Sequence, residues 1–162
     1  MKDKINNIFN PKSKRVFVVA EMSANHSQQI KYAYKIIDYA KKIGVDAIKI
    51  QLYKANKITI NSKNVDFKIK NSKWKKFNTL YKLYKKAETP YKWYDDLSQY
   101  CKKKKIILFS SVFDTDTVDF LEKKKCPIYK IASPEITDIP LLEKVAKTSK
   151  PVIISTGLAN EK

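Results

Sequence analysis

Two stretches decide the fold of this chain: VAEMSANH at Val19–His26 and YKIASPE at Tyr129–Glu135. Each is an apolar run that ends in polar, chemically active residues. The runs AIKIQLY (Ala47–Tyr53) and VIISTG (Val152–Gly157) have the same form. Short apolar runs rich in β-branched residues predict buried strands. Polar groups delivered at the ends of several strands are typical of the active face of a (β/α) barrel.

Helical patterns separate the predicted strands. Apolar residues recur at spacings of three and four between Ile30 and Ala40, and Gly44 follows the lysines that end this pattern. Further helices are predicted to begin at Thr89–Pro90, at Asp114 or Thr115, and at Pro140. The strands are predicted at Val16–Met22, Ala47–Tyr53, Ile106–Ser111, Ile128–Ser133 and Pro151–Thr156.

This alternation predicts an α/β fold with a parallel sheet and right-handed crossovers. Five strands cannot close a barrel, and a complete eight-stranded barrel usually needs about 250 residues, whereas this chain has 162. We therefore expect either an open doubly wound sheet or a truncated TIM-type (β/α)8 barrel, of which this chain is the N-terminal portion. Residues 1–15 are predicted to be an extension, and residues 16–162 the partial barrel.

Residues 54–88 are a long excursion between a predicted strand and the next helix. Lys57–Ile60 and Asp66–Lys70 alternate weakly, which predicts a short hairpin, and Trp74–Ala87 has helical spacing. Connections of this length usually carry a function, so we expect a lid or a substrate loop here.

The net charge of +18 is unusual in a composition that is otherwise typical of a globular protein. Lysines gather where helical patterns end, as in Lys102–Lys105 and Lys123–Lys125, and cations there complement the helix dipole. Arg15 is the only arginine, and arginine is the preferred bidentate ligand of phosphate. We therefore expect no specific nucleic-acid partner.

The remaining bulk features point to a cytoplasmic location. Cys101 and Cys126 fit no metal or redox spacing, so they are predicted to be buried structural thiols. Met1–Pro11 lacks the continuous apolar region of a signal peptide, and no run approaches the length of a membrane span, so no membrane partner is expected.

Two lysines lie within apolar strands, where an unpaired ammonium is costly. Lys49 and Gln51 are two residues apart and therefore share one face of their strand. Lys49 is interpreted either as a phosphate or carboxylate anchor or as a partnered structural lysine. Lys130 repeats the situation, and Ser111, Ser133 and Ser155 supply hydroxyls at strand ends. Such a set suits an anionic, phosphorylated substrate.

Glu21 ends the first strand, and Asn25 and His26 follow it. A carboxylate at this position could act as a general base or orient water. His26 is the only histidine, so we interpret it as a structural residue or a hydrogen-bond donor to substrate. Gly44 and Gly157 are the only glycines, which excludes a P-loop and a dinucleotide fingerprint.

Taken together, VAEMSANH, DAIKIQ, FSSVFD, YKIAS and ISTG resemble the N-terminal half of the sialic acid synthase family, from about Val16 onward. LYKLYKKAETPYKW (Leu80–Trp93) looks most like the pseudaminic acid synthase branch. In FSSVFD, Val112 stands where the family commonly has proline, so the turn after this strand is expected to differ.

The resemblance implies condensation of phosphoenolpyruvate with an amino sugar aldehyde. By resemblance, Glu21 handles the attacking water or its proton. The implied phosphoenolpyruvate-binding set is Lys49, Ser111, Lys130, Ser133 and Ser155. The implied sugar or supporting set is Gln51, Asn25 and His26.

The resemblance also implies parts that this chain lacks. Family members use a divalent metal, manganese or magnesium, to polarise the aldehyde. Its histidine ligands lie on later strands, and a C-terminal antifreeze-like domain completes the site of a protein expected to form a homodimer. We therefore expect no metal ligand here and no synthase activity from this chain alone. The alternative is a non-catalytic anion-binding α/β module.

Overall fold

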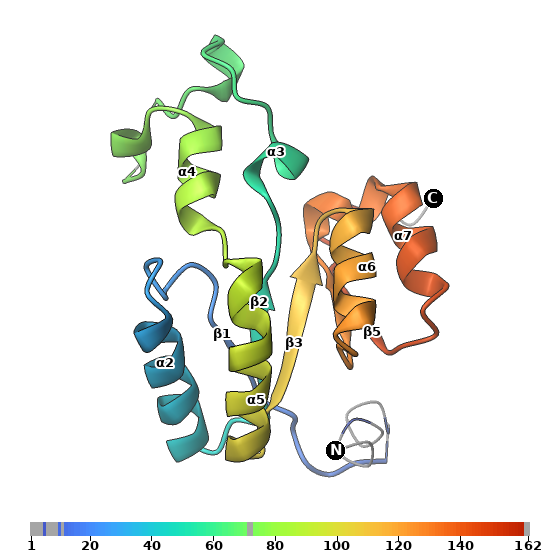
Figure 1. Ribbon diagram of the computed structural model, residues 1–162. Helices are drawn as coiled ribbons and strands as arrows, with labels where there is room; N and C mark the ends of the chain where they lie inside the picture. Colours follow the sequence, from blue (N-terminus) through green and yellow to red (C-terminus); the bar gives the residue numbers. More distant parts are fainter. Residues whose placement is uncertain (1–4, 6–9, 11, 71–72, 161–162) are drawn as a thin grey trace.

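Five parallel strands form one sheet in the order β1-β2-β3-β4-β5 (Figure 1). The computed structural model describes residues 5, 10, 12–70 and 73–160. The strands are β1 (Val19–Glu21), β2 (Ala47–Gln51), β3 (Ile107–Val112), β4 (Tyr129–Ile131) and β5 (Val152–Ile154). Strand order follows chain order without the reversal that defines a doubly wound sheet. The half-barrel expectation is therefore confirmed, and the doubly wound alternative is wrong.

Helices alternate with the strands and cover the outer face of the sheet (Figure 1). They are α2 (Ile30–Lys42), α5 (Tyr94–Lys104), α6 (Thr115–Lys123) and α7 (Ile139–Ala146). Their apolar faces pack on fully buried strand residues, such as Ile48, Ile50 and Ile131. Burial of a side chain of this size contributes about 1.5–3 kcal/mol.

The ends of these helices follow the sequence pattern. Asp114 caps α6, because its carboxylate accepts a 2.8 Å hydrogen bond from the N–H of Thr117. Asp138 caps α7 in the same way through Leu141. Basic residues occupy the last turn of each of the four helices that cover the sheet, as the lysine pattern predicts.

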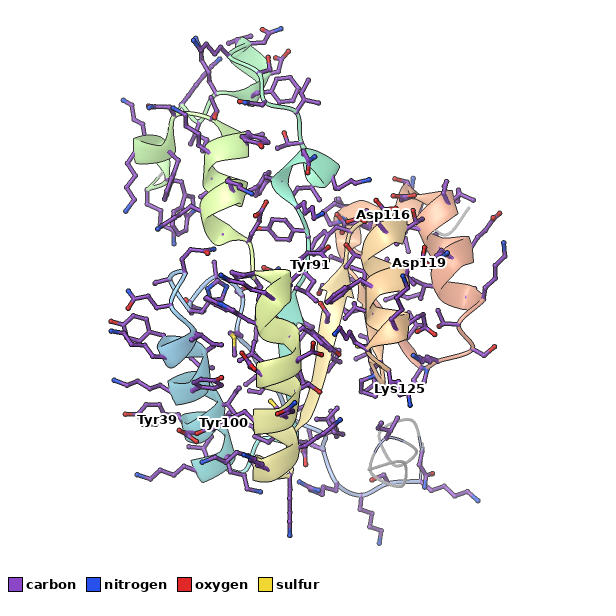
Figure 2. The ribbon with its side chains drawn as sticks, in the orientation of Figure 1. Tyr39, Tyr91, Tyr100, Asp116, Asp119 and Lys125 are labelled. Atoms are coloured by element: carbon purple, nitrogen blue, oxygen red, sulfur yellow. The ribbon has the colours of Figure 1, made fainter. Side chains whose placement is uncertain are left out.

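Surface ion pairs take up part of the lysine excess and link neighbouring elements. Figure 2 shows Asp116 and Asp119, the acidic members of two such pairs, on α6. Asp119 of α6 pairs with Lys144 of α7 at 2.6 Å, and Asp116 pairs with Lys57 at the same distance. These pairs are solvated and screened, so they contribute little to stability.

The excursion stands beyond the carboxyl ends of the strands, at the top of Figure 1. It contains α3 (Ala55–Ile58), two 3-10 turns, η1 (Val65–Phe67) and η2 (Lys75–Phe77), and α4 (Leu80–Ala87). The predicted hairpin is wrong, because its two arms overlap α3 and η1 and do not pair; among the described residues of the excursion, a bridge joins Lys68 to Thr79 instead. The predicted helix is shorter than expected, since Thr79 caps it through the N–H of Lys82.

Two predicted boundaries are also wrong. The first strand begins at Val19 rather than Val16, whose side chain is largely exposed at the sheet edge. Thr89 does not cap a helix: a 3-10 turn, η3 (Tyr91–Trp93), follows Pro90, and α5 begins at Tyr94. The Thr89 side chain is buried and contacts His26. A tertiary contact has replaced the local capping bond that the sequence favours.

Both cysteines are buried free thiols, as predicted. Of the predicted extension, Ile5 packs partly buried against the core and Arg15 forms a 2.5 Å ion pair with Asp46. The described residues contain no helix long and apolar enough to cross a membrane.

Candidate functional site

The polar strand residues lie in register on the face of the sheet that the helices do not cover. Gln51 pairs with Ser111, and Ser111 pairs with Lys130, so these three form a row across β2, β3 and β4. Glu21 and Lys49 form the adjacent row across β1 and β2. Residues in register on parallel strands point to the same face. The parallel ladder therefore brings together groups that are far apart in the sequence.

Lys49 is the most buried cation of this face, with 16% of its side chain exposed. Its ammonium forms an ion pair with Glu21 and donates a 3.3 Å hydrogen bond to Ser111. Burial and the charge of Lys130 lower the pKa of Lys49 to about 8. Lys49 is thus partnered, and the ammonium remains charged at neutral pH.

Lys130 lies on the same face and has no ion-pair partner among the residues that the structure describes. Its ammonium donates 2.6 Å hydrogen bonds to the hydroxyl of Ser155 and to the carbonyl of Ile131. Burial lowers the pKa of Lys130, and the Glu135 carboxylate opposes this change. Two desolvated ammonium groups that repel each other favour binding of a shared anion.

Ser133 has a different position from the other two serines. Its hydroxyl accepts a 3.0 Å hydrogen bond from the N–H of Leu158, in the turn after β5. A Cβ at Gly157 would lie 3.2 Å from the same oxygen, so glycine allows this turn to approach closely. Ser133 therefore holds the turn that follows Ser155, in addition to lying at the end of β4.

Glu135 lies beyond the end of β4 and has no role predicted from the sequence. One carboxylate oxygen is buried and has no hydrogen-bond partner among the described residues. Burial raises the pKa of Glu135, while Lys130 acts in the opposite direction. Its position in YKIASPE, two residues after Ser133 and just beyond a predicted strand, is the feature of the sequence that indicates a place near the site.

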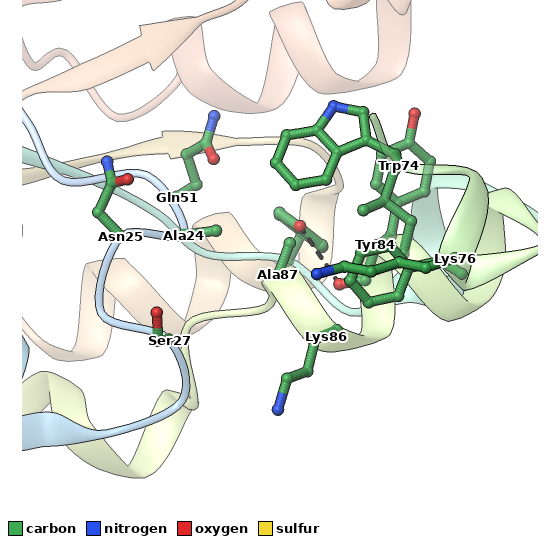
Figure 3. A pocket seen from close by; sticks show the side chains of 12 residues that line it. Ala24, Asn25, Ser27, Gln51, Trp74, Lys76, Tyr84, Lys86 and Ala87 are labelled. Atoms are coloured by element: carbon green, nitrogen blue, oxygen red, sulfur yellow. Dashed lines mark hydrogen bonds between the residues drawn. The ribbon is translucent and has the colours of Figure 1, made fainter. Parts of the chain in front are cut away.

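A pocket of about 510 Å³ lies between the strand ends and the excursion (Figure 3). Asn25, Ser27 and Gln51 line it from the strand side, and Trp74 and Tyr84 line it from the excursion. Amides and hydroxyls on one wall face aromatic rings on the other. This combination suits a ligand with polar substituents on an apolar frame.

Two of the three residues predicted for the sugar or supporting role line this pocket: Asn25 and Gln51. Asn25 donates a 3.0 Å hydrogen bond to the carbonyl of Met22, and Gln51 accepts one of 3.4 Å from Ser23. His26, the third, is fully buried and forms a hydrogen bond with Thr89 at 3.1 Å. The imidazole does not line the pocket. This position agrees with the interpretation of His26 as a structural residue.

The described residues contain no group of three or more His, Cys, Asp or Glu side chains that could hold a metal ion. The residues present on the polar face therefore do not fit a metal centre.

The chain is similar in sequence to a known family of synthases. The sequence model of the NeuB family matches residues 36–162. The chain is 44% identical over 142 residues to a pseudaminic acid synthase of Helicobacter pylori, which covers 88% of the chain and 42% of that relative. It is 45% identical over 148 residues to the pseudaminic acid synthase of a Campylobacter jejuni strain, with 91% of the chain and 43% of that relative covered.

Solved structures agree with these relatives. The N-acetylneuraminic acid synthetase of Leptospira borgpetersenii, solved with citrate, superposes with a TM-score of 0.78 at 30% identity. That match covers 91% of this chain and 47% of the synthetase. A truncated 3-deoxy-D-arabino-heptulosonate 7-phosphate synthase of Thermotoga maritima has a TM-score of 0.58 at 13% identity, which shows a shared fold. The chain spans less than half the length of these relatives, and it belongs to the NeuB family, whose members include pseudaminic and sialic acid synthases.

Proposed function

We propose that this chain is the phosphoenolpyruvate-binding half of a nonulosonic acid synthase, most similar to the pseudaminic acid branch. The observation that carries the proposal is the presence of Lys49 and Lys130 in adjacent rows of one face, with the ammonium of Lys49 bonded to Ser111 and that of Lys130 to Ser155. Glu21 neutralises only one of the two ammonium groups, and a phosphorylated carboxylate supplies further negative charge. The citrate in the Leptospira relative is likewise a multivalent anion.

In the proposed reaction, C3 of phosphoenolpyruvate attacks the aldehyde carbon of an open-chain amino sugar. Water adds at C2, and inorganic phosphate leaves as the C2–O bond to phosphate breaks. Lys49, Lys130, Ser111 and Ser155 would hold the phosphate and carboxylate oxygens, with Ser133 supporting Ser155 through the turn. Glu21, 40% exposed and paired with Lys49, would accept the proton of the attacking water.

The pocket beside this face is the proposed place of the amino sugar. Asn25 and Gln51 present amides from the strand side, and the excursion provides the opposite wall. The family resemblance also implies a manganese or magnesium ion and a homodimer. No described group of side chains fits a metal ion, so the residues of this chain would bind phosphoenolpyruvate and orient water without a metal ligand of their own.

Titration calorimetry with phosphoenolpyruvate tests the proposal on the chain as it stands. We expect binding to the native chain and its loss in Lys49→Met and Lys130→Met. The control is Lys144→Met, which removes an equal charge from the outer helix α7, where Lys144 pairs with Asp119. Equal affinity in all four proteins would refute an anion site on this face.

The second part of the proposal is that the 162-residue chain has no synthase activity alone. Phosphate release from phosphoenolpyruvate, measured with an amino sugar aldehyde and manganese, should stay at the level of the reaction without protein. Turnover by the purified chain would contradict this part and leave the binding result intact.

A further inference from the structure

His26 lies in a backbone segment with an unusual conformation, residues 23–28. Ser23, Ser27 and Gln28 have φ angles of 47°, 48° and 60°, in the left-handed region that non-glycine residues rarely adopt. Such residues persist only where surrounding contacts fix them. The imidazole of His26 provides several of the contacts that fix this segment.

The imidazole has a partner for each ring nitrogen. Its Nδ1 accepts a 3.1 Å hydrogen bond from the N–H of Gln28, so the proton of the neutral ring is on Nε2. Nε2 then donates to the hydroxyl of Thr89, at 3.1 Å. The ring also packs edge-on against Trp93, with centroids 5.3 Å apart. One side chain thus connects the strained segment to the residue that follows the excursion.

Gln28 adds a second connection to the same part of the chain. Its amide donates to the main-chain carbonyls of Lys86 and Glu88, at the end of α4. The Glu88 carboxylate in turn accepts a 2.6 Å hydrogen bond from the N–H of Ala55, where the excursion begins. The start and the return of the excursion are therefore both tied to residues 26–28.

These bonds join two walls of the pocket. Asn25 and Ser27, on either side of His26, line one wall, and Lys86 and Ala87 belong to the opposite wall (Figure 3). His26 points away from the pocket into the protein, where it is fully buried. A change in its bonding would move both walls without any contact between the imidazole and a ligand.

We propose that His26 is a positioning residue that holds residues 23–28 against residues 86–89 and thereby sets the separation of the two pocket walls. This inference concerns the attachment of the excursion and does not depend on the proposed synthase function. It replaces the direct sugar contact that the sequence allowed for His26 with an indirect role.

The bonding pattern requires a neutral imidazole. A second proton on Nδ1 would face the N–H of Gln28 and break that bond. Burial lowers the pKa of His26, so the neutral form persists below the usual range. The packed elements contribute Lys31 of α2, Glu88 of the return segment and Lys92 of η3. The Glu88 carboxylate already binds Lys85 and the N–H of Ala55. Lys31 and Lys92 are exposed to solvent.

The single histidine permits a direct test on the whole chain. The carbon-bound protons of its imidazole give NMR signals that no other histidine overlaps, and their titration reports the pKa. Hydrogen exchange reports the protection factors of the excursion and of β3 separately. Below the measured pKa we expect the excursion to lose about tenfold in protection, the equivalent of one or two hydrogen bonds, while β3 is unchanged.

Matched variants separate positioning from simple packing. Thr89→Ser keeps the hydroxyl and should behave as the native chain, whereas Thr89→Val should lower excursion protection at every pH. His26→Asn keeps an acceptor for Gln28 but cannot reach Thr89, so it should lower protection and remove the pH dependence. Unchanged excursion protection in Thr89→Val, or an equal loss in β3, would overturn the proposal. Thr89→Val and Thr89→Ser decide the outcome even if His26→Asn does not fold.

Discussion

Replacing Lys49 by methionine should stabilise the chain while it removes the proposed anion site. The fall in the Lys49 pKa from 10.5 to about 8 corresponds to a cost on the order of 3 kcal/mol for keeping the ammonium in the fold. The substitution also removes the partner of Glu21 and of the Ser111 hydroxyl, which offsets part of the gain. We therefore expect Lys49→Met to raise the free energy of unfolding by about 1–2 kcal/mol at pH 7.

Removal of one member of an ion pair is destabilising when the other member stays buried. Glu21 differs, because 40% of its side chain is exposed and its carboxylate can be rehydrated. For a chain of this length, a gain of 1–2 kcal/mol corresponds to a rise in Tm of about 2–8 °C. Thermal unfolding followed by circular dichroism measures this rise.

The dependence on pH gives the same prediction a second readout. Between pH 8 and 10.5 the unfolded chain binds more protons at this position than the folded chain, so native stability increases with pH. The advantage of Lys49→Met should therefore shrink over this interval. Lys144→Met controls for the loss of one positive charge from a chain of net charge +18. A lower Tm for Lys49→Met, or an advantage that persists at pH 10.5, would refute the reasoning.

Three further predictions concern the anion site, the core and the sheet edge. Affinity for phosphoenolpyruvate, measured by calorimetry, should fall about tenfold per pH unit above pH 8 as Lys49 loses its proton, and Lys49→Arg should flatten this profile. Leu97→Ala should lower the free energy of unfolding in urea by about 2–5 kcal/mol, because Leu97 is fully buried; a loss below 1 kcal/mol would contradict its place in the core. The native chain should associate through the exposed edge strand β5 as its concentration rises in light scattering, and Ile154→Lys should reduce this association; no association of the native chain, or unchanged association of the variant, would contradict this.

The sheet could be predicted because its signal is local. Each buried strand is a short apolar run, and each covering helix has apolar residues on one face. Strand order then follows from short right-handed connections. The register of Gln51, Ser111 and Lys130 also follows, since polar residues near the carboxyl ends of parallel strands meet at one edge of the sheet.

The excursion could not be predicted because its structure depends on contacts distant in sequence. Lys57–Ile60 alternates like a strand, yet its residues fall in or next to α3, which is held by Glu88 at the other end of the excursion. Thr89 precedes a proline, as capping residues often do, but its hydroxyl binds His26, which lies 63 residues away. The spacing of apolar residues in the sequence does not reveal that Glu88 holds α3 or that His26 binds Thr89.

A substitution of Glu135 tests which of two opposing effects on the pKa of its carboxyl group is larger at the end of β4. Burial raises its pKa and Lys130 lowers it, and burial is the larger effect. A carboxyl group whose folded pKa is raised contributes stability at low pH and loses it as the pH rises through that pKa. Glu135→Gln should therefore be more stable than the native chain at pH 7, and the difference should vanish near pH 4. Urea unfolding at both pH values measures this. A variant that is less stable at pH 7 would show that attraction to Lys130 outweighs burial, and that the polar face already balances its own charge without an anion.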